Sequence, residues 1–288
     1  MQQYGLIGHP LGHSFSAAFF TEKFAREHID ARYENFDLAE VNNLRDWVSA
    51  HPELVGFNVT IPHKQAVVPQ LDSLSPEAEA VGAVNVVRVR RTDGGGLRLD
   101  GHNSDLLGFT RSIAPLLCPH HRRALVLGTG GASKAVVVGL RRLGVAPTYV
   151  SRRAASSLPV DGIPVPVITY AELSAPVLAA HTVIVNASPV GMAPAVENAP
   201  DLPYGALTPT HLLYDLIYNP LNANRVVNFC EFTTRFLRGL PWRRAEGGGD
   251  GLRVRRIPEI PGFQRLQMQH LQTVFHRATA QFPLMEEA

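Results

Sequence analysis

The sequence has little lysine and little excess charge of either sign. Only three of its 27 basic side chains are lysines, Lys23, Lys64 and Lys134, and the others are arginines. The net charge of +2 at pH 7 is too small to predict binding to nucleic acid or to an anionic membrane surface. We therefore expect a small-molecule substrate as the main partner, and an isolated lysine in such a chain is a candidate for a specific chemical role.

Cysteines and long apolar runs are also scarce. Cys118 and Cys230 lie far apart and match no metal-binding or redox spacing, so no metal is expected and a reducing cytoplasm is the default. No apolar run reaches the roughly 18 residues that a membrane span needs. The first ten residues lack the basic and apolar regions of a signal peptide. We expect a cytoplasmic protein, monomeric or homodimeric, without a membrane segment.

The order of the predicted elements indicates an α/β protein. The 288 residues suffice for two domains of roughly 150 residues each. Up to residue 103, short strands alternate with helical segments; from residue 104, a helix, an apolar strand, a glycine turn and a second helix follow one another. This alternation predicts a parallel, doubly wound sheet. Residues 236–257 are rich in Arg and Gly without a regular period, and a helical pattern returns over residues 258–288.

A glycine turn joins a buried strand to a helix in "LVLGTGGASKA". Gly128, Gly130 and Gly131, followed by Ala132, let the backbone turn tightly and approach a pyrophosphate, whose charge is favoured by free N–H groups at the helix start. The spacing departs from G-x-G-x-x-G, because Ser133 lies near the position of the third glycine. A turn without any ligand is the alternative, but the pattern favours a dinucleotide site.

The end of the next predicted strand indicates which dinucleotide is bound. An NAD site usually presents an acid about 20 residues after the glycine turn, where it binds the ribose hydroxyls. This chain has Ser151, Arg152 and Arg153 there. Guanidinium groups bind a 2′-phosphate through charge-assisted, forked hydrogen bonds, whereas a carboxylate would repel it. We therefore predict NADP as the cofactor, with a solvated basic strand end as the simpler alternative.

Lys64 follows the predicted strand in "GFNVTIPHK", and Asp105 lies in "GHNSDLLGF", where the two halves of the chain meet. Such a pair can manage the proton of a reacting hydroxyl or carbonyl: the ammonium donates a proton or stabilises an alkoxide, and the carboxylate orients it. Arginine stays protonated and could not replace the lysine. The hypothesis is that the two residues form a catalytic pair, although a single Lys or Asp more often has a surface or structural role.

Other polar residues stand near the predicted strand ends of the first half, where ligands of α/β sheets bind. These candidates for substrate binding are Ser14, Ser16, Thr60 and Asn85. Each of them could instead be a cap or a turn residue.

Seven motifs, in order, make the chain resemble the shikimate dehydrogenase family: GHPLGHSFS, GFNVTIPHK, VGAVN, GHNSD, GTGGASKA, NASPVGM and DLIYNP. They span about the first 220 residues. The resemblance implies two domains around a cleft: a substrate-binding domain over residues 1–103, completed by residues 258–288, and a Rossmann-like NADP-binding domain over residues 104–235. It also implies reversible reduction of 3-dehydroshikimate to shikimate with NADPH, a step of aromatic amino-acid biosynthesis.

The resemblance also implies roles for single residues. Lys64 and Asp105 would be the catalytic pair, and Asp105 would also bind the substrate. The other implied substrate contacts are Ser14, Ser16, Thr60, Asn85, Tyr218 and Gln269. In the second domain, Asn186, Ser188 and Met192 would lie in the loop beside the nicotinamide.

Two departures from the family pattern leave alternatives open. Arg152 matches the phosphate-binding motif of the family, but the downstream arginine of that motif is missing. The connection after Pro220 is about twice as long as expected, and only part of the last motif, including Gln269, is present. The tail is therefore either an insertion before a degraded motif or unrelated sequence. The alternative functions are an NAD-dependent quinate/shikimate dehydrogenase and a catalytically impaired paralogue that binds shikimate-like molecules.

Overall fold

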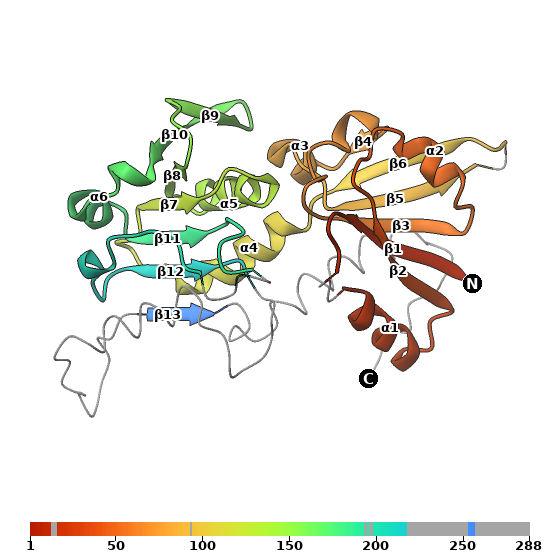
Figure 1. The fold of residues 1–288 in the computed structure, drawn as a ribbon, viewed down its shortest axis with the longest axis horizontal. Helices are drawn as coiled ribbons and strands as arrows, with labels where there is room; N and C mark the ends of the chain where they lie inside the picture. The colour runs from red at the N-terminus through yellow and green to blue at the C-terminus, as the bar shows by residue number, and fades with distance from the viewer. Residues whose placement is uncertain (13–15, 93, 193–194, 196–197, 218–252, 257–288) are drawn as a thin grey trace. The chain divides into compact units, whose positions relative to one another are not determined.

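The computed structural model describes residues 1–217 apart from 13–15, 93, 193–194 and 196–197, and it also describes residues 253–256 (Figure 1). The described residues up to Leu107 form one compact unit, and those from Gly108 onward form a second. The boundary falls inside the helix α4 (Asp105–Ile113), so Asp105 belongs to the first unit.

The first unit is built on a mixed sheet with the strand order β2-β1-β3-β5-β6-β4. Its strands are β1 (Gln2–Gly8), β2 (Ala31–Asp37), β3 (Leu54–Val59), β4 (Ser73–Leu74), β5 (Val86–Arg91) and β6 (Leu97–His102). Its helices are α1 (Ser16–Arg26), α2 (Leu44–Ser49), α3 (Pro76–Val81) and the 3-10 turn η1 (Val68–Gln70). β1 runs parallel to β2 and β3, whereas β5 runs antiparallel to β3 and β6.

Helices cover both faces of this sheet, because successive side chains of a strand point to opposite faces. On β1, Leu6 belongs to an apolar cluster with Phe20 and Phe24 of α1. Its neighbour Ile7 belongs to a second cluster with Leu44 and Val48 of α2. The sheet is therefore a buried layer between α1 and α2 (Figure 1).

The second unit is built on a sheet with the strand order β13-β12-β11-β7-β8-β10-β9, in which only β9 and β10 are antiparallel neighbours. Its strands are β7 (Arg123–Leu127), β8 (Ala146–Ser151), β9 (Ser157–Val160), β10 (Ile163–Thr169), β11 (Val183–Asn186), β12 (Leu212–Asp215) and β13 (Arg253–Arg256). Its helices and 3-10 turns are α5 (Gly131–Arg142), α6 (Ala175–Ala180), η2 (Ala114–Leu116), η3 (Tyr170–Glu172) and η4 (Tyr204–Ala206).

The parallel strands of the second unit have the order of a doubly wound dinucleotide-binding fold. Numbered along the chain from β7, and without the short β9, they lie in the order 3-2-1-4-5-6. The order reverses between β7 and β11, and ligands of such sheets bind beyond the carboxyl ends of the strands at this point. The predicted α/β class and the Rossmann-like second domain are confirmed.

The structure also contains elements that the sequence did not indicate. β9 and β10 form a hairpin whose turn residues Asp161 and Gly162 have positive φ angles of 54° and 67°. β13 lies in the Arg/Gly-rich stretch 236–257 and pairs in parallel with β12. A four-residue strand made of one valine and three arginines has no apolar pattern, so hydropathy could not predict it. The helical pattern over residues 258–288 lies outside the described residues.

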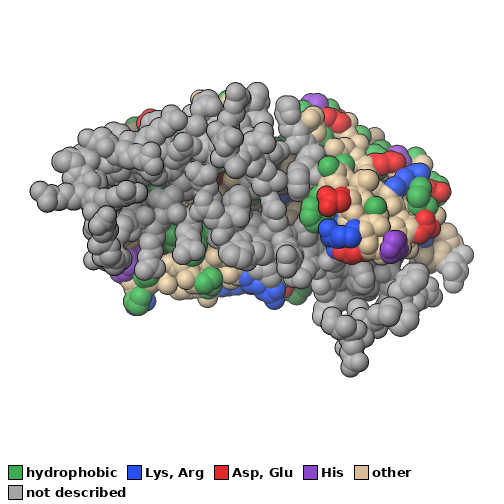
Figure 2. All heavy atoms as spheres, turned by 90° about the horizontal axis from the view of Figure 1, so that it is seen from below, with side chains coloured by type: hydrophobic (Ala, Val, Ile, Leu, Met, Phe, Trp, Pro, Cys, Tyr) green, Lys and Arg blue, Asp and Glu red, His purple; other side chains and the backbone are tan. Residues whose placement is uncertain are grey.

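The helices and the possible metal ligands of the described residues can be examined directly. None of the helices in this part of the chain is long and apolar enough to cross a membrane. The same residues contain no group of three or more His, Cys, Asp and Glu side chains that could hold a metal ion. On the face drawn in Figure 2, basic and acidic side chains of the first unit lie next to one another.

Candidate active site

Lys64 and Asp105 form an ion pair in the first unit. Lys64 Nζ donates a hydrogen bond to Asp105 Oδ2 at 2.7 Å, and the two side chains are 16% and 17% exposed. Lys64 lies five residues beyond β3, and Asp105 is the first residue of α4, where the partial positive charge of a helix start favours a carboxylate. The sequence-based hypothesis that these residues meet is therefore matched by the geometry. A largely buried but reachable ammonium is the result.

Asn85 binds the other oxygen of the same carboxylate. Its Nδ2 donates to Asp105 Oδ1 at 2.8 Å and to Ser104 Oγ at 2.9 Å, and its Oδ1 accepts from Ser104 N at 2.9 Å. The Asn85 side chain thus forms three hydrogen bonds with Ser104 and Asp105. The sequence had indicated Asn85 as a substrate contact, and that stays a prediction; in the structure its amide holds the Asp105 carboxylate in place.

Backbone hydrogen bonds hold Lys64 beside Asn85. Val84 N donates to Lys64 O at 2.7 Å, and Val59 N donates to Asn85 O at 2.9 Å. Gly82 is the C-cap of α3, and its φ of 63° lets the chain turn directly into this segment. Ser75, with Oγ 3.2 Å from Ala78 N, caps the start of the same short helix. The turn at Gly82 and the two backbone hydrogen bonds therefore fix the position of Asn85.

Thr60 lies between β3 and Lys64, and the end of β1 comes very close to it. Thr60 N donates to Ile7 O at 2.9 Å. A Cβ atom at Gly8 would lie 2.3 Å from Thr60 Cγ2, so only glycine allows this approach. The predicted substrate residue Ser16 begins α1 and is partly buried. The other predicted substrate residues, Ser14, Tyr218 and Gln269, lie outside the described residues.

The glycine turn of the second unit has the features of a phosphate site. Gly128 has a φ of 102°, and a Cβ there would lie 3.1 Å from Ala187 O, so glycine allows the loops after β7 and β11 to meet. Gly130 is the N-cap of α5, and a Cβ there would meet nothing within 4 Å. Gly131 and Ala132 form the first turn of α5, whose N–H groups have no partner within the helix. Open space beside such N–H groups fits the pyrophosphate of NADP.

The end of β8 carries exposed cations. Ser151 is the last residue of the strand, and its Oγ accepts a hydrogen bond from Arg153 N at 3.0 Å. Arg152 and Arg153 are both exposed. Their guanidinium groups can therefore reach a phosphate in solvent, and this fits a cofactor with a 2′-phosphate.

The loop after β11 is organised by two side chains. Asn186 is 0% exposed, and its Oδ1 accepts from Ser188 Oγ at 2.7 Å and from Ser188 N at 3.2 Å. Val190 N donates to Ser188 Oγ at 3.3 Å. Met192 is 40% exposed. Of the residues predicted to lie beside the nicotinamide, Met192 thus offers an accessible side chain, whereas the amide of Asn186 is turned into the protein.

Sequence reasoning missed two residues of these networks. Ser104 is 1% exposed, and its Oγ accepts a hydrogen bond from the side-chain amide of Asn85. Asp215 is 5% exposed, and its Oδ1 accepts a hydrogen bond from Asn186 Nδ2 at 3.2 Å. The signal for Asp215 was an acid directly after the apolar run "LLY" of a buried strand. Ser104 next to Asp105 carried no comparable signal.

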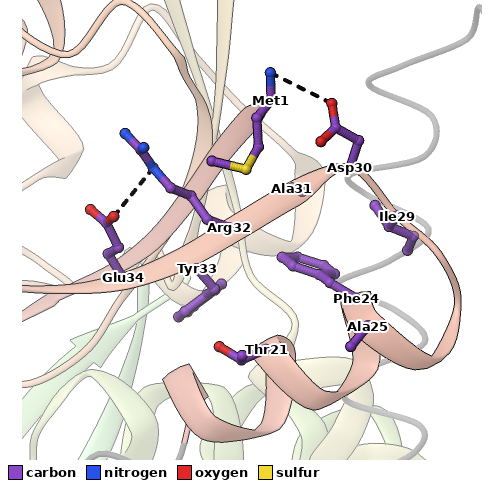
Figure 3. A pocket seen from close by; sticks show the side chains of 10 residues that line it. All are labelled: Met1, Thr21, Phe24, Ala25, Ile29, Asp30, Ala31, Arg32, Tyr33 and Glu34. Atoms are coloured by element: carbon purple, nitrogen blue, oxygen red, sulfur yellow. Dashed lines mark ion pairs between the residues drawn. The ribbon is translucent and has the colours of Figure 1, made fainter.

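A hollow of about 450 Å³ lies elsewhere in the first unit, between α1 and β2. Figure 3 shows Phe24 and Tyr33 with the charged Asp30, Arg32 and Glu34 around it. None of the predicted site residues lines this hollow. It is therefore separate from the Lys64–Asp105 pair.

Comparisons with known proteins agree with the motifs. A family model described as the shikimate dehydrogenase substrate binding domain matches residues 6–87. The NADP(+) shikimate dehydrogenase of Desulforamulus reducens is 34% identical over 237 residues, which cover 76% of this chain and 78% of that protein. The corresponding protein of Oleidesulfovibrio alaskensis is 34% identical over 266 residues, 90% of this chain and 91% of that protein. The chain belongs to the shikimate dehydrogenase family.

Solved structures of other family members share the fold. The shikimate dehydrogenase of Peptoclostridium difficile has a TM-score of 0.72 at 24% identity, over 99% of this chain and 94% of that chain. The shikimate 5-dehydrogenase of Thermus thermophilus, in complex with NADP(H) and shikimate, has a TM-score of 0.68 at 26% identity, over 99% of this chain and 95% of that chain. The shikimate dehydrogenase fold thus extends over both units.

The contacts of Asn85 lead to a stability prediction. We expect Asn85→Ala to lower the free energy of unfolding by about 1–3 kcal/mol, because the buried Ser104 N–H and Asp105 Oδ1 lose their hydrogen bonds to Asn85. The exposed Asn35 of β2 is the matched control, and Asn35→Ala should change the value by less than about 0.5 kcal/mol. Urea denaturation of the three proteins measures both effects. Equal stability of the two variants would contradict the network.

Proposed function

We propose that the protein catalyses the reversible reduction of 3-dehydroshikimate to shikimate with NADPH. The observation that carries the proposal is the Lys64–Asp105 pair at 2.7 Å, in a chain of the shikimate dehydrogenase family. The glycine turn at α5 and the exposed arginines after β8 support the choice of cofactor. When bound, NADPH supplies the hydride that reduces the carbonyl carbon of the substrate.

Lys64 supplies the proton of this reaction. As the carbonyl carbon becomes tetrahedral, negative charge develops on the oxygen, and an ammonium beside it stabilises that charge and donates a proton to form the hydroxyl. In the reverse direction the neutral amine accepts the hydroxyl proton. Asp105 keeps the ammonium oriented and compensates its charge, and Asn85 keeps Asp105 in place through its second oxygen.

The remaining substrate contacts are proposals of the same kind. Thr60 directly follows β3, and Ser16 begins α1 after the loop that leaves β1; hydroxyl groups near strand ends can bind the hydroxyls and carboxylate of a small polar acid. Asn85 and Ser14 are assigned to the substrate on their positions near strand ends and on the family motifs, and Tyr218 and Gln269 on the motifs alone. The predictions of a cytoplasmic location and of a monomer or homodimer stay predictions.

Arg152 and Arg153 favour NADP over NAD. An NAD-dependent quinate/shikimate dehydrogenase would gain from an acid at the end of β8, where its carboxylate could bind ribose hydroxyls. Here the strand ends in Ser151 and two guanidinium groups. Gly128 and Gly130 would serve either cofactor, so the discrimination rests on the arginines.

The role of Lys64 can be tested with NADPH oxidation in the presence of 3-dehydroshikimate. We expect Lys64→Ala to lower kcat by about 10²–10⁴-fold, because the developing alkoxide loses its proton donor. Lys64→Arg should lose nearly as much, since arginine keeps the charge but holds its proton. Lys23→Ala on α1 is the control and should keep kcat within about twofold. Wild-type turnover in Lys64→Ala would contradict the proposal.

The choice of cofactor can be tested at Arg152. We expect Arg152→Ala to raise KM for NADPH by about 10–100-fold, because a charge-assisted hydrogen bond to the 2′-phosphate is worth about 1.5–3 kcal/mol. KM for NADH should stay unchanged, since that cofactor has no such phosphate. The control is the exposed Arg122, which directly precedes the amino end of β7, whereas the cofactor is expected at the carboxyl ends of the strands. An equal rise in KM for both cofactors would show that Arg152 does not bind the 2′-phosphate.

A further inference from the structure

The carboxyl group of Asp215 has no part in the proposed reaction, yet it is buried beside the nucleotide-binding edge of the second unit. Asp215 ends β12 and pairs in register with Asn186 at the end of β11. Its Oδ1 accepts hydrogen bonds from Asn186 Nδ2 at 3.2 Å and from Ile217 N at 2.9 Å. One carboxyl oxygen thus joins the ends of two neighbouring strands.

Asn186 connects this carboxyl to the loop over residues 186–191. Its Nδ2 donates to Asp215 Oδ1 and to Val190 O, each at 3.2 Å, and its Oδ1 accepts both hydrogen bonds from Ser188. All four hydrogen-bonding positions of the amide are therefore used inside the protein. Asn186 therefore shapes the loop, and its hydrogen bond to Asp215 fixes the position of the loop relative to β12.

We propose that Asp215 is a positioning residue that holds the 186–191 loop in the geometry that binds the cofactor. The inference rests on the proposed function, because this is the loop assigned to the nicotinamide end of NADPH. Without an acceptor at residue 215, an N–H of the buried Asn186 amide and the Ile217 N–H both lose their partner. The loop would then open to find other partners.

The surroundings of the carboxyl favour its neutral form. Burial raises the pKa of Asp215 to about 7. Its neighbour on β11 is the uncharged amide of Asn186, and the hydrogen bonds that its Oδ1 accepts from Ile217 and Asn186 lower the pKa by less than burial raises it. Tyr214, the preceding residue of β12, is hydrogen-bonded to Ser112 of α4. Because the folded state holds this proton up to about pH 7 and the unfolded state releases it near pH 4, the stabilisation by Asp215 falls as the pH rises through that window.

Hydrogen exchange of the Ser188 and Val190 amides in the cofactor-free protein tests the loop directly. In Asp215→Leu, which removes both hydrogen bonds, we expect these amides to exchange about tenfold faster or more. The exposed Asp201 is the matched control, and Asp201→Asn should leave the exchange unchanged. Unchanged exchange in a folded Asp215→Leu protein overturns the proposal.

NADPH affinity at pH 6 and pH 8, from fluorescence titration, is the second readout. The wild type should lose affinity between these values as a buried carboxylate forms, and Asp215→Asn, which cannot ionise, should lose less. Comparison at equal pH cancels the titration of the NADPH phosphate. An equal pH dependence in both proteins overturns the proposal even where Asp215→Leu does not fold. If the wild type binds no NADPH, the proposed function fails, whereas the exchange data still decide the role of Asp215.

Discussion

A largely buried lysine and aspartate are tolerated only when each charge has partners, because an unpaired ion removed from water costs several kcal/mol. Lys64 and Asp105 meet this constraint at 2.7 Å, and Asn85 binds the second carboxylate oxygen at 2.8 Å. The three side chains come from the segment after β3, the start of α4 and the segment between α3 and β5. These segments are therefore coupled, since a shift of any one would leave a charge or an amide without its partner.

The second unit meets a similar constraint without an ion pair. Asn186 fills its four hydrogen-bonding positions from Ser188, Val190 and Asp215, and Asn85 in the first unit binds both Ser104 and Asp105. In both units an asparagine at or near a strand end, with planar donors and acceptor, joins an apolar sheet to a polar loop. Rigid sheets can thus position loops that carry chemistry, because the hydrogen bonds leave few alternative arrangements.

Motifs and periodicity predicted much of this arrangement, and packing decided the rest. The sequence alone indicated a tight turn at the glycines 128, 130 and 131 and a cationic strand end after β8, because both features depend only on local residue types. The inward turn of Asn186 could not, since it depends on Asp215, 29 residues away. β13 also escaped prediction, because a short arginine-rich strand forms only through its pairing with β12. Local chemistry is visible in a sequence, whereas a partner brought by the fold is visible only where a motif points to it, as for Lys64 and Asp105.

The most direct test of the central claim is a double-mutant cycle on Lys64 and Asp105, with kcat/KM for 3-dehydroshikimate and NADPH as the measured quantity. If the two side chains act as one unit, Lys64→Ala combined with Asp105→Ala will lose about as much activity as Lys64→Ala alone. The coupling free energy will then exceed about 1 kcal/mol. Losses that multiply, with a coupling near zero, would contradict a shared role and leave the 2.7 Å contact a structural ion pair only.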